Sequence, residues 1–269
     1  MRYLRVAAVA CVFVGLLGSA FSYSLLGTKW AMGPNQATNN LGNLGTAGSA
    51  TWSIMGSGLG MAGFDPHDGD LTDYFGNLLG GAGLAEEVAM INSVFDTWAA
   101  VSGFVNLGQA IDGNVFGGAS QASGGHLGDI RIGLVNFASG GPGGVLAHAF
   151  QPNTEANGGS IGWTIGGDVH MDAFENWVDN PFDTTGDLTF DLYTVLLHEV
   201  GHSLGLGHSE EEDSVMFAFY GGGRRSLHAD DIAGIQAIYG PEAVPEPATI
   251  AGLGLGAAYI LRRRKKKAA

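Results

Sequence analysis

Three histidines and a glutamate lie close together in the stretch LLHEVGHSLGLGHS, residues 196–209. On a helix, His198 and His202 would be one turn apart, so both imidazoles would project from the same side. Gly205 follows, and glycine readily adopts the left-handed conformation that ends a helix and reverses the chain. The chain can then bring His208 back to the same point. Three imidazoles around one point suit zinc, and a fourth position left for water is typical of a catalytic site.

Glu199 follows the first of these histidines directly. Its angle around the helix would place the carboxylate beside a metal rather than on it, which is where a general base for water is needed. The opposite side of the helix is apolar. The alternative interpretation is a set of core histidines satisfied by backbone groups. Five specified residues in register, on a helix that ends at the required glycine, favour the metal site.

Bulk composition excludes one class of function and narrows the others. The chain has 269 residues, of which 45% are hydrophobic, so a sizeable core is possible. Its formal net charge of −14 argues against nucleic-acid binding, which requires a basic surface. An acidic chain fits an extracellular protein whose carboxylates could hold calcium. The single cysteine, Cys11, lies in a segment that we expect to be removed, so no disulfide is expected.

The N-terminal segment, residues 1–22, has the layout of a secretory signal peptide. Two arginines precede an apolar run from Val6 to Leu17, and small residues follow that run. Cleavage is expected after Ala20 or Ser22. A short membrane anchor is the alternative, but the run is too short to span a bilayer comfortably.

The C-terminal segment, residues 241–269, combines three features in order: Pro-Glu-Pro at 245–247, an apolar stretch at 248–261 and a basic block at 262–267. This arrangement resembles the PEP-CTERM sorting signal of Gram-negative bacteria. The resemblance implies a transient membrane contact and an exosortase-type enzyme that removes the tail, in the way that other hydrophobic C-terminal signals are removed. A permanent C-terminal anchor is the alternative. Either interpretation sends the protein to the cell envelope, the cell surface or the medium.

Between the two ends, residues 23–240 read as one domain with mixed secondary structure. Apolar residues at helical spacing predict three helices, at 84–101, 191–205 and 228–240. Alternating or short apolar runs predict strands at 50–55, 129–137, 144–151 and 166–174. The polar stretch at 64–70 is expected to be a turn-rich loop. Mixed strands and helices predict an α+β or α/β fold.

The stretch DVHMD, residues 168–172, is unusual for a strand. Alternation would place Asp168, His170 and Asp172 on one face of the strand, with apolar side chains on the other. Three metal-compatible side chains on one strand face are costly unless solvent or ions satisfy them.

The pattern His-Glu-x-x-His-x-x-Gly-x-x-His is the metzincin signature. Residues 23–240 resemble the matrixin branch of that family. Met216 stands where matrixins place the Met-turn and would form an apolar floor under the zinc. The segments at 95–107 and 227–240 are similar to the first helix with its following strand and to the C-terminal helix. The resemblance implies an α+β metzincin-like fold with a twisted, mostly parallel five-stranded sheet, about three helices and a small C-terminal subdomain.

The resemblance also implies structural metals. It matches two residues to a structural zinc and four residues to two calcium sites: His148 and His170 for zinc, Asp172 and Glu175 for one calcium, and Asp129 and Asp168 for the other. The chain between Asp129 and His148 is shorter than in typical matrixins, so the loop that supplies a His-x-Asp pair to this zinc is missing. His126 could take the missing place, or it could be a surface residue.

These features together predict an exported zinc-dependent endopeptidase that acts on protein or peptide substrates. We expect Glu199 to take a proton from water whose pKa the zinc lowers. An extended substrate would pair with the edge at Leu146–Phe150, and the loop Phe217–Leu227 would shape the specificity pocket. Tyr220 could assist the transition state or serve in packing. The alternative is a non-proteolytic calcium- or zinc-binding envelope or biofilm-matrix protein that keeps the fold, although such a protein has no use for Glu199.

Overall fold

The computed structural model describes most of the central part of the chain, with gaps. The described residues are 21–32, 37–38, 44–60, 68–79, 83–112, 128–137, 143–152 and 166–242. Most of the predicted signal peptide, His126 and the predicted sorting segment from residue 243 onward lie outside these ranges. None of the helices among the described residues has the length and apolar character needed to cross a membrane.

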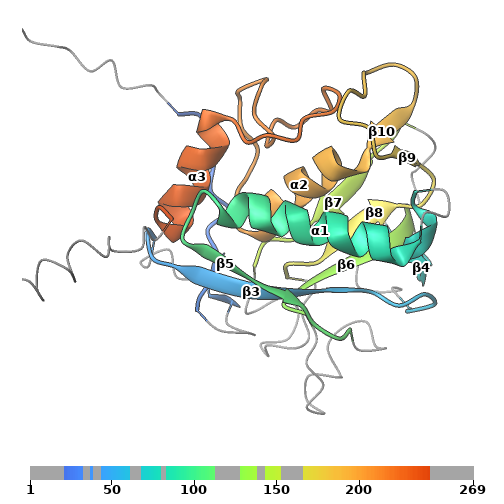
Figure 1. Ribbon diagram of the computed structural model, residues 1–269, viewed down its shortest axis with the longest axis horizontal. Helices are drawn as coiled ribbons and strands as arrows, with labels where there is room; N and C mark the ends of the chain where they lie inside the picture. Colours follow the sequence, from blue (N-terminus) through green and yellow to red (C-terminus); the bar gives the residue numbers. More distant parts are fainter. Residues whose placement is uncertain are drawn as a thin grey trace, which may run out of the picture.

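A mixed sheet forms one layer of the domain (Figure 1). Five of its strands follow the order β5-β3-β6-β8-β7. Three of the four pairings along this path are parallel, and β7 alone runs antiparallel to its neighbour. The strands are β3 (Gly48–Ile54), β5 (Phe104–Gln109), β6 (Ile130–Phe137), β7 (Ala147–Ala149) and β8 (Val169–Asp172). The predicted mostly parallel five-stranded sheet is confirmed.

A sixth strand, β4 (Asp68–Asp73), pairs antiparallel with the second half of β6. The prediction of a loop over 64–70 was therefore wrong from residue 68 onward. Acidic residues and glycine have low strand propensity, but backbone pairing with a buried neighbour outweighs that preference. Two small pairs lie outside the main sheet: β1 (Lys29–Trp30) with β2 (Ala37–Thr38), and β9 (Asn176–Val178) with β10 (Thr189–Asp191).

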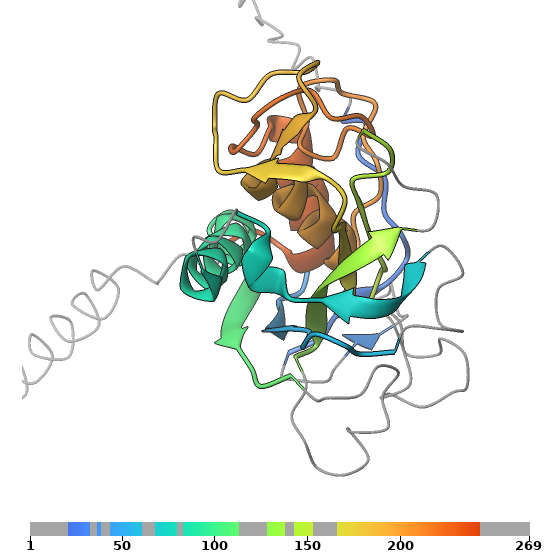
Figure 2. The ribbon, with the colours of Figure 1, turned by 90° about the vertical axis from the view of Figure 1, so that its right-hand side faces the viewer.

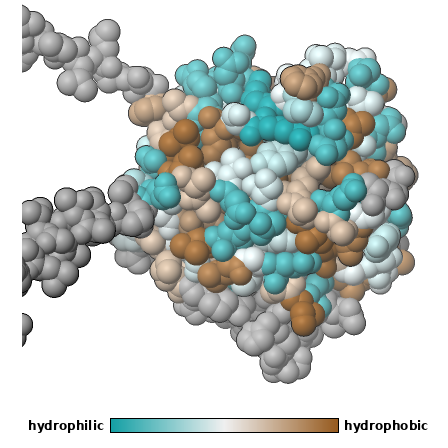
Figure 3. Space-filling model, in the orientation of Figure 1, coloured by the Kyte–Doolittle hydropathy of each residue, from teal (hydrophilic) through white to brown (hydrophobic). Residues whose placement is uncertain are grey.

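The helices α1 (Leu84–Ala99) and α2 (Leu192–Ser203) lie side by side over one face of the sheet (Figures 1 and 2). Trp98 of α1 is fully buried, and its indole Nε1 donates to the carbonyl of Leu197 at 3.0 Å. The outer surface over α1 mixes hydrophilic and hydrophobic residues (Figure 3). The third helix, α3 (Ala229–Tyr239), stands near the C-terminal end of α2. All three helices match their predicted ranges to within two residues.

The two ends of α2 have clear local causes. Asp191 caps the N-terminus by accepting from the backbone N–H of Thr194 at 3.1 Å. Gly205 has φ +106°, the left-handed conformation that the sequence predicted for this position. A side chain at Gly205 would also collide with the carbonyl oxygen of Thr28. The chain therefore turns sharply after α2 and continues toward His208.

An N-terminal segment, residues 22–30, runs along this turn. Leu26 N–H donates to Gly205 O at 2.9 Å, and Gly207 N–H donates to Ser24 O at 2.8 Å. The hydroxyl of Ser24 donates to the carbonyl of His208 at 2.7 Å. The sequence offered no signal for this arrangement, because the segment has neither helical nor strand periodicity. It supports the turn that carries the third histidine.

We predict that Gly48→Ala destabilises the domain. A Cβ at Gly48 would overlap the carbonyl oxygen of Trp30 and lie 2.6 Å from Cε1 of Tyr239. Overpacking of this kind should lower the free energy of unfolding in urea by about 1–3 kcal/mol. Gly60→Ala is the matched control, because a Cβ there meets nothing within 4 Å, and its effect should stay within about 0.5 kcal/mol. Equal effects of the two substitutions would contradict this packing.

Candidate metal centre

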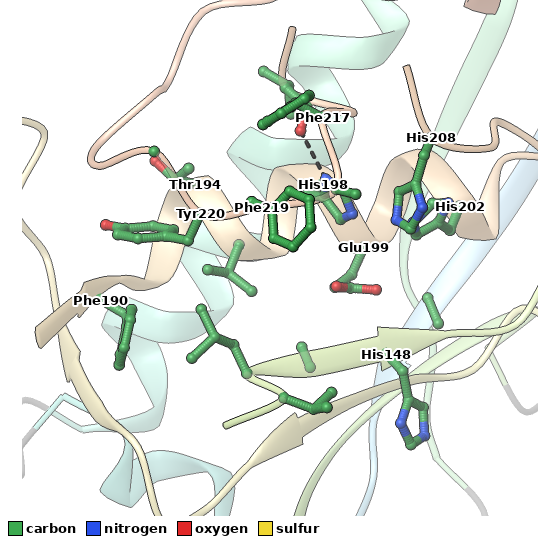
Figure 4. Close-up of a pocket in the computed structure, with 18 of the residues that line it drawn as sticks. His148, Phe190, Thr194, His198, Glu199, His202, His208, Phe217, Phe219 and Tyr220 are labelled. Carbon is green, nitrogen blue, oxygen red and sulfur yellow. Dashed lines mark hydrogen bonds between the residues drawn. The ribbon is translucent and has the colours of Figure 1, made fainter. Parts of the chain in front are cut away.

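The three predicted histidines converge at the C-terminal end of α2 (Figure 4). One ring nitrogen from each lies within 4.8 Å of those from the other two. The ring centroids are separated by 4.7 Å for His198 and His202, 4.8 Å for His202 and His208, and 5.4 Å for His198 and His208. Among the residues that the structure describes, no other group of three or more His, Cys, Asp or Glu side chains is placed to hold a metal ion.

Backbone carbonyls orient two of the rings. Nδ1 of His198 lies 2.7 Å from the carbonyl of Val215, and Nδ1 of His202 lies 2.7 Å from the carbonyl of Leu206. Because a carbonyl only accepts, both rings donate from Nδ1 and keep the lone pair of Nε2 for another ligand. Metal-binding histidines are commonly held in this way, by a hydrogen bond from the ring nitrogen that does not face the metal.

The histidines are also in the right protonation state. Burial lowers the pKa of His198 to about 4 and the pKa of His202 to about 3. Desolvation lowers the pKa of His208 as well. At neutral pH the rings of His198 and His202 are therefore uncharged, which is the form that binds a metal. Three neutral imidazoles with aligned nitrogens fit a zinc ion with one further position open.

Glu199 lies beside this group and has little contact with solvent, with 5% of its surface exposed. Its Oε2 is buried and has no hydrogen-bond partner among the described residues. Burial raises the pKa of Glu199 to about 8. Its carboxylate projects from α2 into the space toward β7 (Figure 4). A buried carboxyl group without a partner is costly, and a nearby cation would relieve that cost by favouring its charged form.

Met216 packs under α2, and the role that the resemblance implies for it, an apolar floor under the zinc, stays a prediction. It is 2% exposed, and its carbonyl accepts from Ser209 N–H at 2.9 Å. A Cβ at Gly201 would collide with Sδ of Met216 and lie 3.0 Å from Cζ2 of Trp98. The glycine inside the HEVGH stretch is therefore required by the methionine below it, a role that the sequence reasoning missed.

Asp231, at the start of α3, was also missed. Its carboxylate accepts from Ser214 Oγ, from Val215 N at 2.9 Å and from Met216 N at 3.1 Å. The carbonyl of Val215 in turn accepts from His198. Asp231 therefore fixes the turn that orients one of the histidines. Its position in the sequence indicates only a helix start, because contacts between separate segments leave no periodic signal.

A pocket of about 690 Å³ adjoins the histidines. One wall is the segment Gly143–Ala149, which includes β7, and the opposite wall is the segment Phe217–Gly221. Among the described residues β7 pairs only with β8, so its outer edge borders the pocket. Both the predicted edge at 146–150 and the predicted specificity loop at 217–227 contribute residues to this pocket.

The predicted structural-zinc ligands lie together on neighbouring strands. His148 and His170 are paired in the register of β7 and β8, with His148 Nε2 3.1 Å from His170 Nδ1. His148 also stacks on Phe137 with 4.8 Å between ring centroids. His126, which could supply a third ligand to this zinc, lies outside the described residues. A zinc at this pair stays a prediction.

The predicted calcium ligands lie at the two ends of β8. Near its start, Asp129 accepts from Thr51 N at 2.7 Å, and Asp168 is buried with its pKa raised to about 7 by that burial. Past its end, Asp172 accepts from Phe174 N at 3.1 Å, and Glu175 accepts from Gly143 N at 2.9 Å. The backbone N–H groups offset part of the cost of burying Asp129, Asp172 and Glu175. Calcium at either end of β8 stays a prediction.

Comparison with known proteins agrees with the resemblance drawn from the sequence. Residues 128–240 match the family model described as Matrixin, and residues 243–265 match the PEP-CTERM protein-sorting motif. The chain is 48% identical over 106 residues to interstitial collagenase of Sus scrofa, covering 39% of this chain and 19% of that protein. It is 40% identical over 121 residues to matrilysin of Homo sapiens, covering 42% of this chain and 40% of that protein. The matched region thus spans less than half of the length of either relative, and both predicted resemblances are confirmed.

We predict that Asp231→Ala weakens zinc binding. Loss of its hydrogen bonds frees the turn that orients His198, and substitutions of this kind typically cost about 10–100-fold in metal affinity. Competition with a chelating dye measures the affinity, and circular dichroism checks the fold. Asp213→Ala, at an exposed position in the same loop, is the control and should leave zinc affinity unchanged. A folded Asp231→Ala protein with wild-type affinity would contradict the proposed positioning.

We further predict that zinc binding displaces a proton from Glu199. With its pKa raised to about 8, the carboxyl group is mostly protonated at pH 7 in the metal-free protein. The charge of a bound zinc lowers that pKa, so the proton leaves, whereas His198 and His202 are already neutral and release none. Calorimetry in buffers of different ionisation enthalpy should show about one proton more for wild type than for Glu199→Gln. Equal proton release from the two proteins would refute the coupling.

Proposed function

We propose that this chain, whose residues 128–240 match the matrixins, is an exported zinc-dependent endopeptidase. The observation that carries the proposal is the buried carboxyl group of Glu199 beside three neutral, converging imidazoles. A purely structural metal site needs its ligands but has no use for an uncoordinated carboxyl group. Such a group in a pocket is what general-base catalysis requires.

In this proposal His198, His202 and His208 hold the zinc. When bound, zinc supplies a Lewis acid that polarises a carbonyl and lowers the pKa of water. Glu199 takes the proton from the attacking water and delivers it to the leaving amine. Its burial supports this double role, because a group with a pKa near the working pH can both accept and release a proton. Val215 and Leu206 keep two imidazoles in the metal-binding tautomer through their carbonyls.

The edge of β7 offers the backbone groups that an extended substrate needs. A peptide that adds to this edge forms main-chain hydrogen bonds, and its alternate side chains enter neighbouring pockets. Because Gly143–Ala149 and Glu199 line the same pocket, a peptide bound at β7 has its backbone between the strand and α2. This placement brings a peptide bond to the general base.

Tyr220 acts as a wall of the pocket rather than as a reactive group. Its hydroxyl donates to Asp183 Oδ2 at 2.6 Å and accepts from Asp191 N at 2.8 Å. Desolvation and the adjacent carboxylate raise its pKa well above the ordinary value of a tyrosine. The hydroxyl proton is therefore already donated to Asp183, which supports the packing role over assistance to the transition state.

The sorting motif indicates export, and we propose three functional segments on that basis. Residues 1–22 are a signal peptide, residues 23–240 are the peptidase domain, and residues 241–269 are a PEP-CTERM tail that contacts the membrane transiently and is removed by an exosortase-type enzyme. The match to the sorting motif over 243–265 supports the last of these. The secreted product then acts at the cell surface or in the medium.

The rival function is a non-proteolytic envelope or biofilm-matrix protein that binds zinc or calcium. The sorting motif and the acidic composition suit it. It gives no account of Glu199, whose buried Oε2 has no hydrogen-bond partner in the described part of the chain. A narrow processing peptidase that acts on other sorted proteins is a variant of the main proposal.

We predict that Glu199→Gln binds zinc but loses casein hydrolysis by about 10²–10⁴-fold, as expected for removal of a general base. Glu210→Gln, an exposed carboxyl in the following loop, should retain wild-type activity. A chelator should abolish wild-type hydrolysis, and added zinc should restore it. Equal, metal-independent activity of wild type and Glu199→Gln would refute the proposal, and zinc binding without hydrolysis by either would favour the envelope protein.

A further inference from the structure

The pocket beside the histidines continues along α2 toward the N-terminal end of the helix. Thr194 and His198 both line it and are four residues apart, so they lie one turn from each other on the same side of α2. Figure 4 shows Phe190, Thr194 and Tyr220 at the end of the pocket that lies away from His202 and His208. A substrate side chain that enters beside His198 would extend toward this far end.

Arg224 lies at this far end and is held at two points. Its backbone N–H donates to Oγ1 of Thr194 at 2.7 Å, and its guanidinium Nη1 donates to the carbonyl of Ser214 at 2.8 Å. It is partly buried and lines the pocket. The first bond anchors the backbone of Arg224 at Thr194, one helical turn or about 6 Å from His198 along α2. The second holds the guanidinium at the carbonyl of Ser214, the residue before Val215.

Among the described residues, no carboxylate lies within ion-pairing distance of the Arg224 guanidinium. The neighbouring Arg225 forms ion pairs with Asp179 and Asp191, whereas Arg224 forms none. Arg225 therefore serves as a structural link between loops, and the remaining donors of Arg224 are available to a ligand. Apolar and aromatic side chains line the same pocket: Phe190, Val195, Val215 and Tyr220.

A glycine next to the guanidinium leaves room for it. A Cβ at Gly221, which also lines the pocket, would lie 2.7 Å from Nη2 of Arg224. The φ angle of Gly221 is not positive, so other residues can adopt its backbone conformation. The small residue is thus explained by the close approach of the guanidinium and not by backbone strain.

We propose that Arg224 makes this pocket select a substrate side chain with an apolar stem and an acceptor at its tip, glutamate before glutamine. The inference rests on the proposed endopeptidase function, and concerns the side chain next to the scissile bond. The apolar walls contact the methylene groups, while the guanidinium donates to the carboxylate in a partly shielded site, where charge-assisted bonds are strong. Leucine would fill the same space but leave the donors of Arg224 unsatisfied.

Peptide binding to the zinc-loaded Glu199→Gln protein tests this inference without requiring catalysis. The probes are fluorescent octapeptides in which one position at a time carries Glu, Gln, Leu or Lys in an otherwise constant sequence. At one position, Glu should bind about tenfold more tightly than Leu, and Gln should lie between them.

Adding Arg224→Met should reverse the order of Glu and Leu. Because Arg224→Met could disturb folding, Gly221→Ala provides a second variant that displaces the guanidinium and should also weaken the preference for Glu.

The outcomes separate this inference from the proposed function. Mass spectrometry of peptides cleaved by the wild-type protein gives the residues that flank each cleaved bond. Cleavage without enrichment of Glu or Gln beside the cleaved bonds, together with equal binding of Glu and Leu peptides, would overturn the role of Arg224. The proposed endopeptidase function would then still stand. Preferred binding of Glu peptides without any cleavage would support the role of Arg224 and refute the proposed endopeptidase function.

Discussion

The burial of a carboxyl group among neutral imidazoles is the constraint on which the rest of this structure depends. Glu199 and two of the histidines lie on one helix. Desolvation raises the pKa of Glu199 and lowers the pKa of His198 and His202, so all three side chains favour their uncharged forms. Without a cation the cluster keeps a proton on the carboxyl group and offers unshared nitrogen lone pairs to the pocket. A divalent metal at the histidines changes both features, because it binds the nitrogen lone pairs and stabilises the ionised carboxylate of Glu199.

The fold supplies this cluster with supports from distant parts of the chain. Met216 packs against Gly201 from below, and Asp231 holds the turn whose carbonyl orients His198. Residues 22–30 run along the segment that brings His208 back to the site. Two of these supports hold His198 and His208 and the third packs against the helix between His198 and His202, so the geometry does not rely on the single helix that carries the motif. The edge of β7 then brings a substrate backbone to the same place.

Features with a local cause could be predicted from the sequence. The helix α2, the turn at Gly205 and the convergence of the three histidines follow from spacing along the chain, whereas the place of Met216 was implied by the family resemblance. The mostly parallel sheet followed from the family resemblance, while β4 (Asp68–Asp73) was missed because aspartate and glycine dominate its sequence. Asp231, the link between Asp183 and Tyr220, and the N-terminal segment were also missed, since each joins segments far apart in sequence. Arg224 and Arg225 illustrate the limit: they are adjacent and identical, yet only their partners show that one links loops and the other lines the pocket.

The central claim is that the three histidines hold a zinc ion with one position open to a small ligand. Zinc-edge X-ray absorption on the protein with one equivalent of zinc tests this most directly. The account predicts three imidazole nitrogens and one further light atom, all at about 2.0–2.2 Å, and a sulfur at about 2.3 Å in place of that light atom once a small thiol is added. It also predicts that this signal is lost in the His208→Ala variant. A zinc that is saturated by protein ligands and excludes the thiol, or an unchanged signal in His208→Ala, would contradict it.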